Sequence, residues 1–257
     1  MLNLAISPIT FLGKLSIFIW NSIAGLRNFH RRLPLIYQQF DFLGVQSFTV
    51  VSFSAVFIGS VVAFQTYVAL HLFGMESFLG SSVGIAMMRE LAPVFCGIMV
   101  AARSGAAIAA EIATMRVTEQ IEAMEALGTD PFDYLIMPRI MAGTLALPLL
   151  CIYFTLIGCA AGYFIATVVH GTDGAVYIQQ LAWAVDFTDV WQGLTKAVIF
   201  GFFLSTLGCF YGYHAENNAE GVGVATNRAV VTASLWILFS DYILTAYLPY
   251  DASNLFL

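Results

Sequence analysis

The chain has 257 residues, of which 60% are apolar and only 10% are charged, and its net charge is −6. Charged residues make up about 25% of a typical soluble domain, so this composition, with its long uncharged runs, predicts an all-α integral membrane protein. The negative charge and the scarcity of basic clusters argue against a nucleic-acid partner.

Residues 9–30 form the first predicted element, a helix that we expect to lie in the cytoplasmic interface of the membrane. One helical stripe carries its larger aliphatic side chains, Leu12, Leu15, Ile19, Ile23 and Leu26. Lys14 interrupts the apolar run, and Arg31 and Arg32 end it, which favours a surface helix over a spanning one. A signal-anchor span is the alternative. No signal peptide is expected, because a charged start followed by a small-residue cleavage site is missing.

Five segments with few or no charges follow, and each approaches the length needed to cross a bilayer. They comprise residues 44–70, 82–102, 140–169, 197–213 and 229–249. The second segment contains Arg89 and Glu90, and the fifth contains Asp241. We therefore predict one membrane domain over residues 1–257, with an interfacial helix followed by five transmembrane helices.

The distribution of basic residues predicts the orientation. Eight of them lie in segments that are cytoplasmic if the N-terminus is inside: Lys14, Arg27, Arg31, Arg32, Arg103, Arg116, Arg139 and Arg228. The segments that would then lie outside, 71–81, 170–195 and 250–257, contain no Lys or Arg, and Lys196 sits at a border. We expect a cytoplasmic N-terminus and a C-terminus on the outer side.

Arg89 and Glu90 are the unusual residues of the second segment. Arg89 lies about 12 Å below the outer end of the segment, at 1.5 Å per residue. One ionised side chain at the centre of a bilayer costs roughly 2.5–3.5 kcal/mol on insertion scales. Two readings stay open: a buried ion pair that fixes helix packing, with Asp241 as a partner, or a polar point in a substrate cavity. Pro93 removes a backbone hydrogen bond nearby and favours a kink.

The acidic region 111–130 is predicted to contain a short amphipathic helix between two spans. Gly128 suits the left-handed position after its last turn, and Asp130 and Pro131 suit the start of the next helix. The apolar residues Ile121, Met124 and Leu127 look exposed on this helix. Such a helix can transmit force from a soluble motor protein to the membrane-spanning segments. The alternative is a solvated loop helix without a partner.

Four stretches of the sequence resemble the MlaE-type permease family, the membrane subunit of ABC systems that move phospholipid between Gram-negative membranes. They are VFIGSVVAFQTY (56–67), RELAPV (89–94), ARSGAAIAAEIATMRVTEQIEAMEALGTDP (102–131) and GVGVATNRAVV (221–231). The resemblance covers nearly the whole chain from Pro34 onward. It implies a multi-pass protein of the inner membrane whose C-terminus is periplasmic.

The resemblance also implies partners and site residues. The partners are a second copy of the chain in a homodimer, two cytoplasmic ABC ATPase subunits, a periplasmic lipid-binding protein with MCE domains, and phospholipid. Residues near the lipid cavity would be Arg89, Glu90, Gln65 and Tyr67. Residues that dock into the ATPase would be Thr118, Glu119, Gln120, Glu122, Met124, Glu125 and Leu127.

The chain contains no G-x-x-x-x-G-K-[ST] phosphate loop, so we expect no enzymatic activity of its own and no cofactor, with ATP and Mg²⁺ bound by the partner ATPase. We also expect no metal site, and the four cysteines read as unbridged core residues. One alternative is an intramembrane enzyme built from the scattered polar residues His71, His170, His214, Asp241 and Glu90. Another is a channel or scaffold that is not driven by ATP.

Overall fold

The computed structural model describes residues 2–25 and 29–247, and all regular secondary structure within these ranges is helical. Five helices are long and apolar enough to cross a membrane, and this confirms the predicted count. They are Arg32–His71, Glu76–Val117, Phe132–Val169, Phe187–Tyr213 and Ala219–Tyr247. The N-terminal helix α1 (Leu2–Ala24) is not among them.

Shorter helices and turns subdivide the first three spans, and α7 and α9 lie between spans. The α-helices after α1 are α2 (Phe29–Leu43), α3 (Phe48–His71), α4 (Leu79–Ala86), α5 (Ala92–Val100), α6 (Ala106–Val117), α7 (Gln120–Ala126), α8 (Met137–Phe164), α9 (Gly174–Ala184), α10 (Phe187–Tyr213) and α11 (Ala219–Tyr247). The 3-10 turns are η2 (Val45–Ser47) and η3 (Glu76–Phe78). The π segments are η4 (Met87–Leu91), η5 (Ala101–Gly105), η6 (Phe132–Ile136) and η7 (Ile165–Val169).

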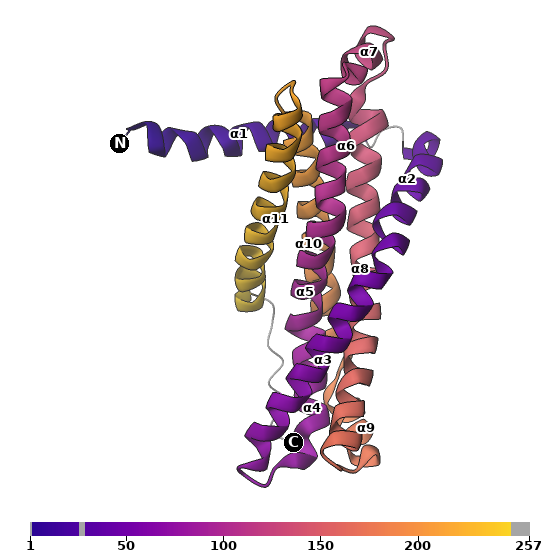
Figure 1. The fold of residues 1–257 in the computed structure, drawn as a ribbon, viewed down its shortest axis with the longest axis vertical. Helices are drawn as coiled ribbons and strands as arrows, with labels where there is room; N and C mark the ends of the chain where they lie inside the picture. The colour runs from indigo at the N-terminus through magenta and orange to yellow at the C-terminus, as the bar shows by residue number, and fades with distance from the viewer. Residues whose placement is uncertain (1, 26–28, 248–257) are drawn as a thin grey trace.

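The spans form an elongated bundle with two distinct ends (Figure 1). One end, called the α7 end below, carries α7 at its tip, and α1 runs across the bundle there. The opposite end, called the α9 end, carries α9 and the turn between α3 and α4. Helices α8 and α10 form the centre, because α8 packs against α2, α3, α5 and α10, and α10 packs against α5, α6 and α11.

The fourth span begins earlier than the uncharged run that predicted it. Its helix starts at Phe187 rather than near residue 197, because Asp186 and Asp189 form a capping box at its first turn. Lys196 was expected at the border of the membrane segment. The structure instead buries it inside the helix bundle, with 1% of the residue exposed.

Glycine allows the closest helix contacts. A Cβ atom on Gly59 of α3 would overlap the carbonyl group of Gly158 on α8. Gly143 of α8 and Gly201 of α10 face each other in the same way, with a Cβ on Gly201 2.5 Å from the Gly143 carbonyl oxygen. These contacts let backbones approach where larger side chains would hold them apart.

Helix α1 packs on the bundle through a face that shares Leu15 and Ile19 with the predicted stripe. Leu15, Phe18 and Ser22 are buried. Phe18 contacts the rings of Phe132 and Phe210, with centroid distances of 5.3 and 5.5 Å. The predicted members Leu12 and Ile23 are exposed, and Leu26 lies outside the described residues.

Candidate functional site

Five ionisable side chains form two neighbouring ion-paired groups in the membrane-spanning helices, and we call them the charged cluster. They come from η4, α10 and α11: Arg89, Glu90, Asp189, Lys196 and Asp241. Buried charges are rare in membrane helices and are retained when they pair or serve a function. The charged cluster is therefore the first candidate for a functional site.

Arg89 pairs with Asp189, one turn into α10. The guanidinium Nε donates to Asp189 Oδ1 at 2.5 Å, and 1% of the Asp189 side chain is exposed. The other carboxylate oxygen of Asp189 accepts from the backbone N–H of Asp186 at 3.0 Å. The capping box thus fixes the carboxylate that holds Arg89.

Lys196 is shared between two carboxylates. Its Nζ lies 2.6 Å from Glu90 Oε2 and 3.0 Å from Asp241 Oδ1. It also donates to the hydroxyl of Thr245 at 2.8 Å, and that hydroxyl lies 3.3 Å from Glu90. This ammonium group therefore ties η4, α10 and α11 together.

The backbone of η4 presents both adjacent charges to neighbouring helices. Residues Met87–Leu91 form a π turn, and Pro93 follows in the first turn of α5. Proline lacks the N–H that a continuous α-helix would use there, and the wider turn absorbs the change in register. Single π turns inside α-helices are frequent at functional sites.

The sequence left two interpretations of Arg89 and Glu90 open. They either form ion pairs that fix helix packing or provide a polar point in a substrate cavity. Both side chains have ion-pair partners within the chain, as the structural reading required. The expected partner Asp241 contacts Lys196 rather than either of them. Asp189 and Lys196 were missed, because their segment was assigned to an outer loop and its border; the D-x-x-D spacing of Asp186 and Asp189 was the signal for an earlier helix start.

The other predicted cavity residues lie on α3. Tyr67 stacks on His170 with ring centroids 3.8 Å apart and on His71 at 5.4 Å, near the α9 end. Gln65 is exposed. No contact within the described ranges joins either residue to the charged cluster, so their place in a lipid cavity stays a prediction.

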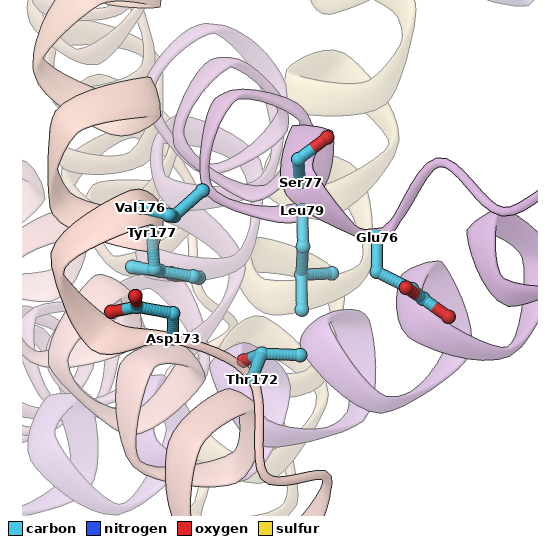
Figure 2. Close-up of a pocket in the computed structure, with 7 residues that line it drawn as sticks. All are labelled: Glu76, Ser77, Leu79, Thr172, Asp173, Val176 and Tyr177. Atoms are coloured by element: carbon cyan, nitrogen blue, oxygen red, sulfur yellow. The ribbon is translucent and has the colours of Figure 1, made fainter.

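A cavity of about 210 Å³ lies at the α9 end. Its lining comes from η3, the start of α4 and the start of α9: Glu76, Ser77, Leu79, Thr172, Asp173, Val176 and Tyr177. Figure 2 shows Leu79 between Glu76 on one side and Asp173 and Tyr177 on the other. Both acids are engaged, since Glu76 pairs with His71 and Asp173 caps α9. Burial raises the pKa of the Tyr177 hydroxyl, which therefore stays protonated.

At the α7 end, the predicted caps are confirmed. Helix α7 covers Gln120–Ala126, and Gly128 follows in the left-handed conformation with φ of 75°. Asp130 Oδ1 accepts from the backbone N–H of Phe132 at 2.9 Å. The helix of the second span continues to Val117 and breaks at Glu119, which has φ of 57°.

The residues of α7 divide into an inward and an outward face. Ile121 is fully buried and Met124 packs on the core, so their expected exposure was wrong. Glu122 pairs with Arg116 at 3.2 Å. Glu125 accepts a long hydrogen bond from Tyr213 at 3.4 Å. Of the seven predicted docking residues, Thr118, Glu119, Gln120, Glu125 and Leu127 are exposed.

Two ion pairs link the helices that lie next to α7. Arg139 of α8 lies 2.9 Å from Glu111 of α6. Arg32 of α2 lies 2.8 Å from Asp133 of η6, and its guanidinium stacks over the Tyr134 ring at 5.0 Å. These two ion pairs join α8 to α6 and α2 to η6.

The side chains of the intramembrane-enzyme alternative fall into three separate places in the fold, with Glu90 and Asp241 in the charged cluster. His71 and His170 lie at the α9 end and His214 follows α10 at the α7 end. Within residues 2–25 and 29–247, no group of three His, Cys, Asp or Glu residues is placed to hold a metal ion. The four cysteines are free.

Comparison with known proteins identifies close relatives. The family described as Permease MlaE matches residues 36–247. A probable ABC transporter permease of Rickettsia conorii is 40% identical, over 91% of this chain and 90% of the relative. The intermembrane phospholipid transport system permease protein MlaE of Haemophilus influenzae is 36% identical, over 91% and 90%. The chloroplast protein TRIGALACTOSYLDIACYLGLYCEROL 1 of Arabidopsis thaliana is 33% identical, over 82% of this chain and 60% of the relative.

Proposed function

The chain belongs to the MlaE permease family, and we propose that it is the permease subunit of an ABC transporter that moves phospholipid between the inner membrane and a periplasmic MCE-domain carrier. The observation that carries the proposal is the form of α7, a short helix at the tip of the bundle with an exposed outer face and a base held by ion pairs. That form fits a helix that receives force from a soluble subunit. The relative from Haemophilus influenzae supports phospholipid as the substrate.

The chemistry of lipid transport agrees with the distribution of side chains. Exposing an acyl chain to water costs roughly 0.8 kcal/mol per CH₂, so a permease must keep the chains in apolar surroundings. The outer faces of α3 and α11 carry many large exposed apolar residues, among them Phe53, Phe57, Leu235 and Phe239. The charged cluster supplies charged groups within the second, fourth and fifth spans.

The proposed assembly contains two copies of the chain, two ATPase subunits that bind ATP and Mg²⁺, and the MCE-domain protein on the other side. Nucleotide-driven closure of the ATPases would push α7 at both copies. The force would pass through the Arg116–Glu122 and Arg139–Glu111 pairs into α6 and α8. These helices would then close the lipid cavity between the two copies and hand lipid to or from the carrier.

In this assembly the α7 end faces the cytoplasm, α1 lies in the membrane interface and the C-terminus is periplasmic. The charge distribution supports this orientation, since segments 71–81 and 170–195 contain no Lys or Arg whereas Arg32, Arg116 and Arg139 lie near the α7 end.

Single-cysteine labelling tests the orientation. In intact spheroplasts, a membrane-impermeant maleimide should label Asp173→Cys, at the α9 end, and should label Leu127→Cys only after the membrane is opened. The native cysteines are buried or half-buried, so their background is low. Labelling of Leu127→Cys in closed spheroplasts would reverse the orientation.

Substitution of Leu127 tests ATPase docking. Leu127 is 83% exposed, and burying a leucine side chain contributes about 1.5–3 kcal/mol. Leu127→Ser should therefore weaken ATPase binding about 10–100-fold, measured by co-purification and by titration of the purified ATPase. The matched control is Leu72→Ser, which changes an equally exposed leucine at the α9 end and should leave binding unchanged. Equal loss in both variants would contradict docking at α7.

The whole proposal is tested by gentle detergent purification of the tagged chain from its own host, followed by mass spectrometry of proteins and lipids. Recovery of an ABC ATPase, an MCE-domain protein and bound phospholipid is the expected result. Recovery of the chain without ATPase or lipid would favour a channel or scaffold instead.

A further inference from the structure

Another cavity, of about 110 Å³, lies between α1 and the first two turns of α8, and we call it the α1 cavity. Its apolar lining comes from α1, α8 and α10: Ile19, Ile23, Met137, Ile140, Met141 and Phe202. The hydroxyls of Ser22 and Thr144 complete the lining, and each donates to a carbonyl of its own helix, at 2.8 and 2.7 Å. A buried water needs about two to four polar partners, so the α1 cavity favours an apolar occupant.

An exposed apolar stripe on α8 continues from the α1 cavity. It starts at Met141 of the lining and proceeds at helical spacing through four exposed aliphatic residues: Leu145, Leu149, Ile152 and Leu156. Contacts between helices in a membrane favour small residues, and α8 uses Gly143 against α10 and Gly158 against α3. A stripe of leucine and isoleucine side chains suits acyl chains better than another helix.

The α1 cavity and the stripe together have the length of one membrane leaflet. Met141 and Ile152 are eleven residues apart, which is about 16 Å of helix. The hydrocarbon core of a bilayer is about 30 Å thick, so one leaflet provides about half of that length. Helix α1 crosses the bundle at the α7 end (Figure 1) and carries the exposed residues Ile17 and Trp20. An acyl chain of the leaflet on the α7 side can therefore pass through the α1 cavity and continue along α8.

Arg32 places a positive charge next to the end of α1. Gly25, which follows the last turn of α1, lies against η6, because a Cβ atom on it would be 3.3 Å from Asp133 Cα. Asp133 accepts from Nε and Nη2 of Arg32 at 3.3 and 2.8 Å. A guanidinium group carries five N–H donors, and the Arg32 side chain is 26% exposed. A phosphate at this level of the membrane would find a matching partner in Arg32.

We propose that the α1 cavity holds an acyl chain of a resident phospholipid from the leaflet on the α7 side, with Arg32 as the partner of its phosphate. The chain fills the space between α1 and α8, extends along the stripe and joins α1 to the bundle. This lipid stays bound. The site requires only a bilayer around the five spans, so it goes beyond the proposed transport and does not depend on it.

Photolabelling in vesicles tests the site. The purified chain is mixed in detergent with phosphatidylcholine and a trace of phosphatidylglycerol that carries a diazirine in one acyl chain, and vesicles are formed and irradiated. Mass spectrometry then locates the label, which should lie within residues 137–144 of the wild type. Ile23→Trp fills the α1 cavity from α1 and should lower this labelling at least about fivefold, because the acyl chain loses its contacts with the cavity wall.

Two further variants make the result specific to the α1 cavity. Met141→Trp fills it from α8 and should cause the same loss of label, so the test does not depend on the folding of one variant. Ile17→Trp is the matched control, since it makes the same change on α1 at an exposed residue outside the cavity lining and should leave the labelling unchanged. Monodisperse elution on size exclusion verifies folding of each protein.

The opposite results are equally clear. A wild type that is labelled at the exposed Leu156 but not within residues 137–144 would overturn the site and indicate that protein covers the α1 cavity. Equal labelling of residues 137–144 in Ile23→Trp and Ile17→Trp would also overturn it, because the label would then come from passing bulk lipid. A diacylglycerol with the same diazirine chain should label these residues less, and equal labelling would contradict the phosphate contact of Arg32.

Discussion

Lys196→Met is expected to destabilise the bundle by about 3–5 kcal/mol, the usual effect of removing one partner from a buried ion pair. The substitution leaves Glu90 and Asp241 facing each other without a cation and separates η4 from α11. For a chain of this size, the loss corresponds to a fall in melting temperature of about 6–20 °C. Size-exclusion chromatography of detergent-solubilised protein after heating steps measures it.

Two control variants assign the effect to charge. Lys196→Met combined with Glu90→Gln and Asp241→Asn removes all three charges and should recover most of the stability, because apolar or neutral replacements of a buried ionic group are often tolerated. Lys14→Met changes the other lysine of the chain, which is exposed on α1, and should have no effect. A triple variant as unstable as Lys196→Met would show that packing of the lysine stem, rather than its charge, holds the helices.

Gly59→Val is expected to have the second large effect, because it forces α3 away from α8. Even a Cβ atom at this position would overlap the backbone of Gly158. Backbone cannot move aside as a flexible side chain can, so the loss of stability should reach about 3 kcal/mol, the upper part of the range for overpacked cores. The melting temperature measured by the same heating assay should fall accordingly.

Gly223→Val is the matched control for that substitution. Gly223 lies in α11, and a Cβ atom there meets nothing within 4 Å. Both variants place the same β-branched residue in a helix, so the difference between them isolates the helix contact from helix propensity. Equal stability of the two proteins would contradict close packing of α3 on α8.

A single helical span connects the charged cluster to the α7 end of the bundle. The span Glu76–Val117 carries Arg89 and Glu90 in η4 and ends beside α7. The distance along the helix from Glu90 to Val117 is about 40 Å at 1.5 Å per residue. The π segment η5 interrupts it, and there Arg103 bonds to Gln46 at 2.9 Å and to the Phe42 carbonyl at 3.1 Å. The span thus joins the charged cluster to the α7 end through α5, η5 and α6.

The sequence by itself determined the features that depend on local chemistry. Long apolar runs predicted five membrane-capable helices, because a helix satisfies its own backbone hydrogen bonds in hydrocarbon. Gly128 and Asp130 predicted the end of α7 and the start of the next helix, because a left-handed residue and an N-cap act within one turn. The family resemblance rested on ordered local motifs and was confirmed by the match to residues 36–247.

Only the tertiary structure decided which distant side chains meet. Arg89 and Asp189, or Glu90 and Lys196, are about a hundred residues apart, and no local pattern pairs them. Lys196 was expected at the edge of a span, because the predicted spans were drawn as uncharged apolar runs and a charged residue ends such a run. It lies in the interior because two carboxylates from other helices compensate it. The same reason applies to Ile121, whose burial depends on the packing of α7 against the bundle rather than on the pattern of its own helix.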